Sequence, residues 1–360
     1  MHKYILIIAS YIFAHQPLMA QEHHDKNFND AYAAYQKAIT AEDPRLIINT
    51  AKQAFNLGEI KFGESINTAN LAVNYANALA EQTYVSHEQQ QQVSDLRLAL
   101  YQQALTLFEQ YNGQQHLSLI DPLIGLATIE TKQINAKKAK KHLLRAVDIA
   151  QHHNQPQLEA DLYLEIFEQL KQPKYISKAY AIHQTSLPEN SLARLKSTFY
   201  MAKYEQAKNN PKQAITLYNQ VIEQLEILDF SHPYLLAGHA ALVKLYQDED
   251  QSEQATAHCI AIGKMSPWDD EQEQTALYRV PPKYPLAYAK RSKEGSVQLS
   301  FTVTEQGFVK DPKVISVKGG DSFIKPSLAA LKNWRYAPKF ENGKAVAAQS
   351  TVQLDYRINK

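Results

Sequence analysis

The chain has 360 residues, of which 44% are hydrophobic and 21% are charged, and its formal net charge is +1. This length allows two or three domains, and this hydrophobic content excludes wholesale disorder. The charge is unevenly divided, because residues 280–360 carry 14 Lys and Arg against 6 Asp and Glu, a net of +8, while the remainder has a net of −7. This asymmetry allows two interpretations: the acidic helical part and the basic terminal segment attract each other, or the charge steers the terminal segment to an acidic partner. The basic residues are scattered through a strand-rich segment, so we expect no nucleic-acid partner.

Residues 1–20 have the pattern of a secretory signal peptide. A short, weakly basic start precedes a largely apolar run from Tyr4 to Ala14, and the segment ends in the small residue Ala20. Eleven residues are too few to cross a hydrocarbon core, which needs about 20. We therefore expect cleavage after Ala20 and export, with the mature protein lacking a membrane anchor.

Residues 21–265 are predicted to form an array of helix pairs. Glycine is sparse there, and a segment beginning at His116 recurs 116 residues later at His232, a register that also pairs Ala139 with Ala255. The alternation of small and large side chains in these helices resembles that of tetratricopeptide repeats, in a longer variant of about 40 residues. The resemblance implies a solenoid whose concave face binds an unknown protein. A generic helical bundle is the alternative.

The sequence carries no motif of a catalytic, cofactor or metal site, so we predict that the protein is not an enzyme. His23 and His24 follow the expected cleavage point and are interpreted as a frayed terminus. His152 and His153 end a predicted helix, where cations complement the helix dipole. The single cysteine, Cys259, lies in a helical apolar pattern and is predicted to be a buried structural thiol.

A polar linker is expected at residues 266–279, and residues 280–360 are predicted to form a small α+β domain that folds independently. Hydrophobic residues alternate with polar ones along residues 295–303, which predicts a strand with one buried face. A turn at residues 305–307, a second strand over 309–317 and a helix over 327–334 follow. The last strand is expected over residues 351–358, at the edge of the sheet.

Several short motifs follow one another in this segment. They are Pro-x-Tyr-Pro at 282–285, Gly-x-Val-x-Leu-x-Phe-x-Val at 295–303, Gly307 with Val309, Trp-Arg-Tyr-x-Pro at 334–338 and Asn-Gly at 342–343. In this order they resemble the TonB C-terminal domain. Two positions depart from that family, because Tyr288 stands where alanine is common and Pro281 stands where well-known members have glutamine.

The resemblance implies a periplasmic protein that binds outer-membrane TonB-dependent transporters by adding a transporter segment as a strand, in support of energy-coupled transport. The residues expected to contact that segment are Arg279, Lys283, Gln353, Asp355 and Arg357. Structural roles are expected for Tyr284, Pro285, Gly295, Trp334 and Tyr336. The alternative is a periplasmic scaffold in which this domain is a docking module, or forms a homodimer through its edge strand.

Overall fold

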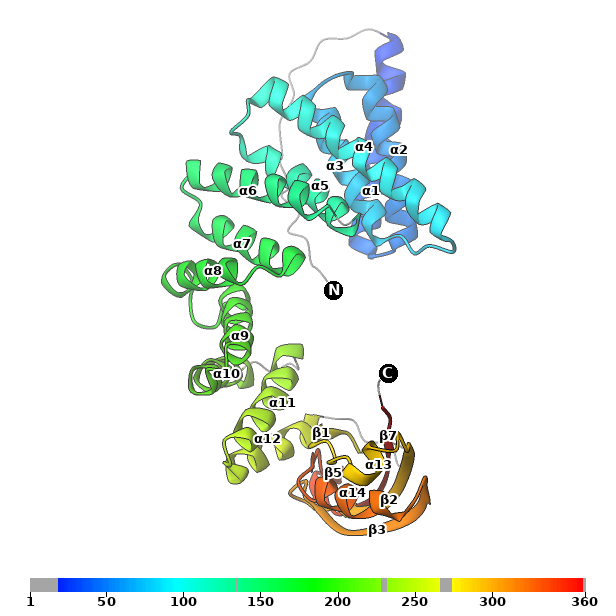
Figure 1. Cartoon of the computed structure of the whole chain (residues 1–360). Helices are drawn as coiled ribbons and strands as arrows, with labels where there is room; N and C mark the ends of the chain where they lie inside the picture. Colours follow the sequence, from blue (N-terminus) through cyan, green and yellow to red (C-terminus); the bar gives the residue numbers. More distant parts are fainter. Residues whose placement is uncertain (1–18, 134, 228–231, 266–273, 359–360) are drawn as a thin grey trace. The chain divides into compact units, whose positions relative to one another are not determined.

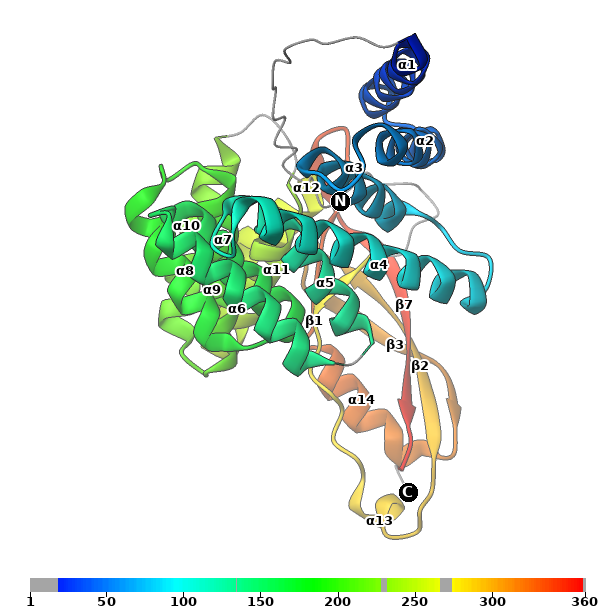
Figure 2. The same ribbon diagram turned by 90° about the horizontal axis from the view of Figure 1, so that it is seen from above.

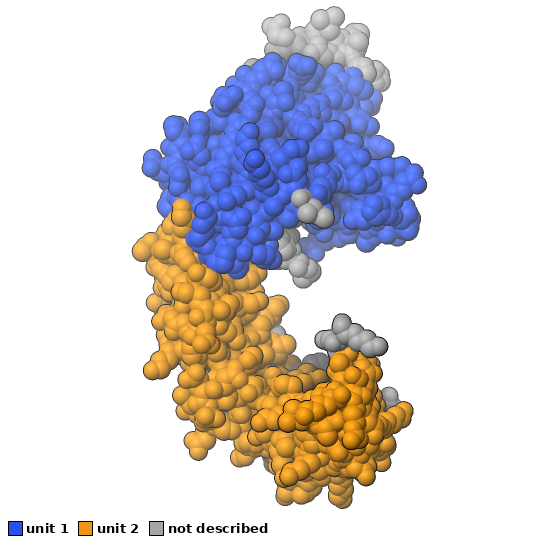
Figure 3. All heavy atoms as spheres, viewed as in Figure 1, with its two compact units in different colours: residues 1–175 blue, residues 176–360 orange. Residues whose placement is uncertain are grey.

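The computed structural model describes residues 19–133, 135–227, 232–265 and 274–358, and for residues 19–26 it describes the backbone alone. Within these ranges the chain is helical up to Met265, and its strands lie from Ala276 onward (Figure 1). Two compact units are present, one ending at Tyr175 and the other beginning at Ile176 (Figure 3). The predicted fold class, a helical array followed by a small α+β domain, is confirmed.

The first unit consists of helices joined by short turns. They are α1 Met19–Ala41, α2 Pro44–Phe62, α3 Ile66–Ala78, α4 His87–Asn112, α5 Ile120–Lys132, α6 Ala136–His152 and α7 Pro156–Leu170, with 3-10 turns η1 Leu79–Glu81 and η2 Leu117–Leu119. Asp43, Ser65 and Ser86 cap α2, α3 and α4 by accepting backbone N–H bonds from the first turn. Fully buried Ala69 and Ala104 lie on the paired helices α3 and α4, where their small side chains allow close approach.

The second unit begins within α8 and ends with the terminal domain. Its helices are α8 Pro173–Ser186, α9 Leu192–Ala207, α10 Pro211–Glu226, α11 Pro233–Asp248, α12 Ser252–Met265, α13 Leu286–Ala289 and α14 Ile324–Leu331, with a 3-10 turn η3 Asp321–Phe323. Pro211 and Pro233 occupy the first turns of α10 and α11, where the missing N–H costs no hydrogen bond. Phe199, Tyr218 and Leu242 belong to one buried core that joins α9, α10 and α11.

The 116-residue spacing in the sequence corresponds to equivalent positions in two helix pairs. The ring Nδ1 of His116 accepts a backbone N–H bond from the residue two positions later, and Nδ1 of His232 does the same, at 3.2 and 3.1 Å. Ala139 in α6 and Ala255 in α12 are both fully buried. Each copy is a helix, a short turn and a second helix, as the sequence predicted.

The terminal domain contains three small antiparallel sheets. The strands are β1 Ala276–Tyr278, β2 Gly295–Val303, β3 Val309–Lys318, β4 Arg335–Tyr336, β5 Lys339–Glu341, β6 Lys344–Val346 and β7 Ala348–Tyr356. The main sheet has the order β3-β2-β7, and the two short sheets pair β1 with β4 and β5 with β6. Helix α14 lies beside the main sheet (Figure 2). Its Leu331 is part of the buried core of the terminal domain.

The last strand differs in extent from the prediction. It begins at Ala348, three residues earlier than expected, and ends at Tyr356, so Ile358 lies beyond it. The extent of β7 follows from its partner strand β2. The two ends of β2, Val303 and Gly295, lie opposite Ala348 and Tyr356. A strand needs ladder partners along its length, and β7 has them only over these nine positions.

The expected linker falls partly outside the described residues, which omit 266–273. The remainder of it includes β1, which pairs with β4 and therefore belongs to the terminal domain. The compact unit that holds this domain also includes the helices from Ile176 onward.

Candidate functional site

The core beneath the main sheet positions the candidate site. Val297, Leu299, Phe301 and Val303 are buried on alternate positions of β2, so the alternation in the sequence correctly gave the buried face. Trp334 and Tyr336 are each 3% exposed and lie in the same core. Nε1 of Trp334 donates to the Val280 carbonyl at 2.9 Å, which fixes the chain as it enters the domain.

Tyr284, Pro285 and Gly295 occupy positions that suit structural roles. The Tyr284 ring meets those of Phe323 and Tyr356 edge-on, at centroid distances of 5.7 and 5.4 Å. Pro285 caps α13, and its carbonyl accepts the N–H of Tyr288. A Cβ on Gly295 would lie 2.3 Å from the Lys318 carbonyl oxygen and 2.6 Å from the Phe323 ring, so a side chain at this position would clash.

Strand β7 forms one edge of the main sheet. All nine of its residues pair with β2, without a bulge and without proline, and β2 is its only strand partner in the described part of the chain. An edge strand of this regularity offers backbone N–H and C=O groups at a constant spacing, which is what an added strand requires.

Strand β3 forms the other edge and is irregular. Two register shifts interrupt its pairing with β2. Pro312 lies within it, the preceding Asp311 has a φ of +52°, and Lys310, Lys313 and Lys318 are all exposed. Proline, bulges and lysines are the features by which proteins block an edge against further pairing. The two edges of this sheet therefore differ, and β7 is the one suited to accept a strand.

Three of the predicted contact residues lie together at the C-terminal end of β7. Gln353 and Asp355 are exposed, on the face of β7 opposite to buried Leu354 and Tyr356. Nε2 of Gln353 donates to Asp355 Oδ1 at 2.8 Å, and a guanidinium nitrogen of Arg357 lies 3.8 Å from Asp355 Oδ2. The resulting polar cluster flanks this edge of the main sheet.

Arg279 and Lys283, the other two predicted contact residues, are both exposed. The Arg279 guanidinium lies over the Trp334 ring, 5.1 Å from its centroid, a cation–π contact that helps to order the segment before the first turn of the domain. The structure shows no contact that joins either residue to the cluster on β7.

Sequence reasoning missed Arg335, which is 1% exposed and the largest fully buried side chain described. Its guanidinium nitrogens donate to Ser252 Oγ at 3.0 Å, to Thr256 Oγ1 at 2.7 Å and to the Gln306 carbonyl at 3.1 Å. The sequence did contain an indication of this position. Alternation along Trp334-Arg335-Tyr336 places Arg335 on the face of the strand opposite to the two buried aromatic residues. A buried charge needs such partners, and here two of the three come from α12, a helix distant in sequence.

Cys259 lies beside this guanidinium and is fully buried, as predicted. Burial raises the pKa of its thiol to about 11, although the nearby Arg335 opposes that shift. The thiol is therefore protonated at neutral pH, and its burial suits a role in packing.

A pair of histidines, of which His239 is buried and His258 is half-buried, lies between α11 and α12. Nδ1 of His239 is 2.8 Å from Nδ1 of His258, so one ring donates and the other accepts. The His258 ring stacks on Tyr246 at 5.5 Å. Burial, with the charge of His258, lowers the pKa of His239 to about 4, which keeps this ring neutral at pH 7.

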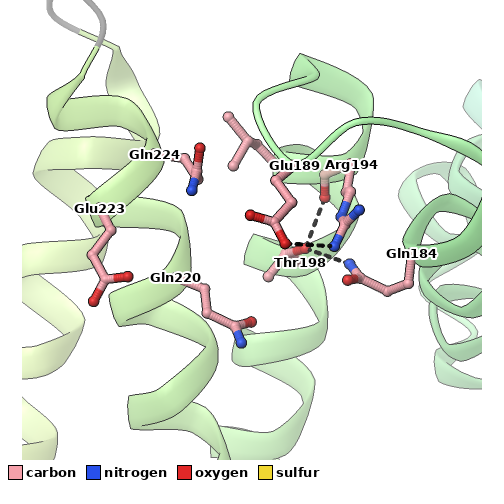
Figure 4. A pocket seen from close by; sticks show the side chains of 8 residues that line it. Gln184, Glu189, Arg194, Thr198, Gln220, Glu223 and Gln224 are labelled. Atoms are coloured by element: carbon pink, nitrogen blue, oxygen red, sulfur yellow. Dashed lines mark hydrogen bonds and ion pairs between the residues drawn. The ribbon is translucent and has the colours of Figure 1, made fainter.

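Helices α8, α9 and α10 enclose a polar pocket of about 240 Å³ (Figure 4). Four of its lining side chains are bonded: Gln184 donates to Thr198 Oγ1, and Arg194 contacts both Glu189 and the Leu187 carbonyl. Amide, carboxylate and guanidinium groups of this kind can form hydrogen bonds with a polar ligand.

The described residues contain no group of three or more His, Cys, Asp or Glu side chains placed to hold a metal ion. None of their helices is long and apolar enough to span a bilayer. His23 and His24 lie where side chains are not described, while His153, after the end of α6, contacts the Gln115 carbonyl at 2.7 Å.

Comparison with known proteins identifies the terminal domain. Residues 280–358 match the family model described as Gram-negative bacterial TonB protein C-terminal. Protein TonB of Pseudomonas aeruginosa is 34% identical over 80 residues, and Protein TonB of Vibrio cholerae is 26% identical over 80 residues. These matches cover 22% of this chain and only 23% and 33% of the two relatives.

Two solved structures from Pseudomonas aeruginosa are also similar. The solution structure of the TonB C-terminal domain is 31% identical and covers 25% of this chain and 92% of its own, with a TM-score of 0.23. The pilF structure is 12% identical and covers 69% of this chain and 95% of its own, with a TM-score of 0.45. The family-model match and the TonB relatives confirm the predicted resemblance of the terminal domain.

Proposed function

We propose that this protein binds TonB-dependent transporters of the outer membrane, and that β7 accepts an extended transporter segment as an added strand. The observation that supports this most directly is the difference between the two sheet edges. Strand β7 is regular and free of proline, whereas β3 carries Pro312, two register shifts and exposed lysines. Main-chain hydrogen bonds to β7 would supply affinity, and the side chains beside it would supply selectivity.

Charge favours an acidic segment. Residues 280–360 carry a net charge of +8, and Arg357 at the end of β7 is 79% exposed. A basic domain attracts acidic ligands over about one Debye length and raises their association rate. Binding should therefore weaken as the salt concentration rises.

The test uses synthetic peptides that span the N-terminal segments of the host's TonB-dependent transporters. Wild-type protein should bind at least one of them. The double variant Gln353→Glu, Arg357→Glu should bind that peptide about tenfold more weakly, equivalent to about 1.4 kcal/mol. The matched control is Lys313→Glu with Ser316→Glu on β3, which changes the net charge by the same amount on the other edge. Both variants should keep the wild-type unfolding midpoint, since all four side chains are exposed.

Absence of binding by wild-type protein at about 1 mM peptide would contradict the transporter proposal. The second candidate is then a periplasmic scaffold in which β7 pairs with a second copy of the chain, because a regular edge also permits self-association. Light scattering over a range of protein concentrations would show this as a dimer that the β7 variant weakens and the β3 variant leaves intact.

We further propose export with cleavage after Ala20, and a helical array that holds a separate protein partner. Coupling to an energised membrane would require that partner to be anchored there. Intact-mass measurement of periplasmic material should give a chain that begins at Gln21. Full-length protein retained in the inner membrane after an alkaline carbonate wash would contradict this.

A further inference from the structure

The terminal domain packs directly against the last helix pair, α11 and α12. Ala337, which follows β4, is 2% exposed and shares a buried cluster with Val243, Cys259 and Ile262 of these helices. β1 contacts α11, and β5 contacts α12. These contacts place an apolar interface between two elements that the sequence presents as separate domains.

Arg335 adds a buried polar contact to this interface. It extends from β4 to Ser252 and Thr256 on α12, and its guanidinium also lies 3.8 Å from the centroid of the Phe308 ring. An arginine can form several hydrogen bonds in fixed directions at once, so it specifies the orientation of the two surfaces as well as their contact. The partner hydroxyls lie one helical turn apart, on the same face of α12.

Gly263 permits the close approach of α12. A Cβ at this helical position would lie 2.6 Å from the Pro338 carbonyl oxygen and 2.9 Å from the Phe340 ring. Glycine weakens a helix interior relative to alanine, so within α12 alone it is the poorer residue. The missing side chain is an advantage only where α12 packs against the terminal domain.

We infer that α11 and α12 form a specific docking site for the terminal domain, and that this interface binds the domain without help from the connecting segment. The interface uses β1, β4 and β5, whereas the proposed transporter site uses β7. If the proposed function holds, a transporter segment on β7 is held in a fixed orientation to α8–α12, and a pull on it reaches the helices through the Arg335 contact.

The test places a specific protease site between Met265 and Gln274 in the full-length protein. After complete cleavage of the wild-type protein, the two fragments should co-elute in gel filtration at about 10 μM. Separation of the fragments at that concentration would overturn the inference. The measurement needs no transporter, so its failure is distinct from a failure of peptide binding.

Two substitutions on the helices test the interface without altering the terminal domain. Gly263→Ala should weaken the association of the cleaved fragments at least tenfold while the helical content stays unchanged. Thr256→Val, which removes one of the hydrogen-bond acceptors of Arg335, should also weaken this association. The matched control is Gly238→Ala in α11, whose Cβ would meet only Ile222 of α10, at 3.2 Å, and it should leave co-elution intact. Equal association for Gly263→Ala and wild type would overturn the inference.

Discussion

Trp334→Ala tests whether the aromatic core holds the terminal domain together. The ring is 3% exposed and packs among the buried residues of β2, and its N–H is bonded to the Val280 carbonyl. Loss of a buried tryptophan costs about 3–5 kcal/mol through lost transfer energy and the cavity that remains. Loss of the N–H partner adds a cost of about 1–3 kcal/mol when the carbonyl is left buried and unpaired.

The assay is thermal unfolding of the full chain, followed by calorimetry because the substitution removes one of two tryptophans. For a unit of this size, each kcal/mol shifts the midpoint by about 2–4 °C, so a combined loss of about 4–8 kcal/mol should lower the transition of the second unit by about 8–32 °C. Trp334→Phe keeps an aromatic ring and loses the hydrogen bond, so it should have a smaller effect. A midpoint within about 2 °C of wild type for Trp334→Ala would refute the assignment of this ring to the core.

Three further predictions concern single residues. Gly295→Ala should destabilise by about 1–3 kcal/mol, measured by urea unfolding, because its methyl group meets the Lys318 carbonyl; no loss would show that the two strands can separate at little cost. His239 has a pKa of about 4 in the folded state and 6.5 in the unfolded state. Between pH 4 and 6.5 the unfolded chain therefore binds more protons than the folded chain, so the free energy of unfolding should fall as the pH drops from about 6.5 to 4. The His239→Gln variant should show a shallower pH dependence in calorimetry than wild type, and an equal slope would contradict this assignment. Cys259 should react with a thiol reagent only on unfolding, since its pKa of about 11 and its burial protect it; rapid labelling of the native protein would contradict this.

The sequence by itself determined much of the local structure. Period-two alternation gave the buried face of β2, because side chains in a strand point to opposite faces whatever the strand pairs with. The Asn342-Gly343 turn lies between β5 and β6, and Gly343 has the positive φ that such turns need. The 116-residue repeat likewise identified equivalent helix pairs, because the capping role of His116 and His232 depends on neighbours two residues away.

The features that depend on contacts between residues far apart in the sequence were decided only by the tertiary structure. The length of β7 follows from where β2 ends, and the difference between the two edges appears only once β2 is found between β3 and β7. Arg335 and Gly263 each look unfavourable in their own element, one as a charge beside buried aromatics and the other as a glycine within a helix. Both become favourable when α12 meets the terminal domain, because contact energies between elements far apart in the chain are absent from local patterns.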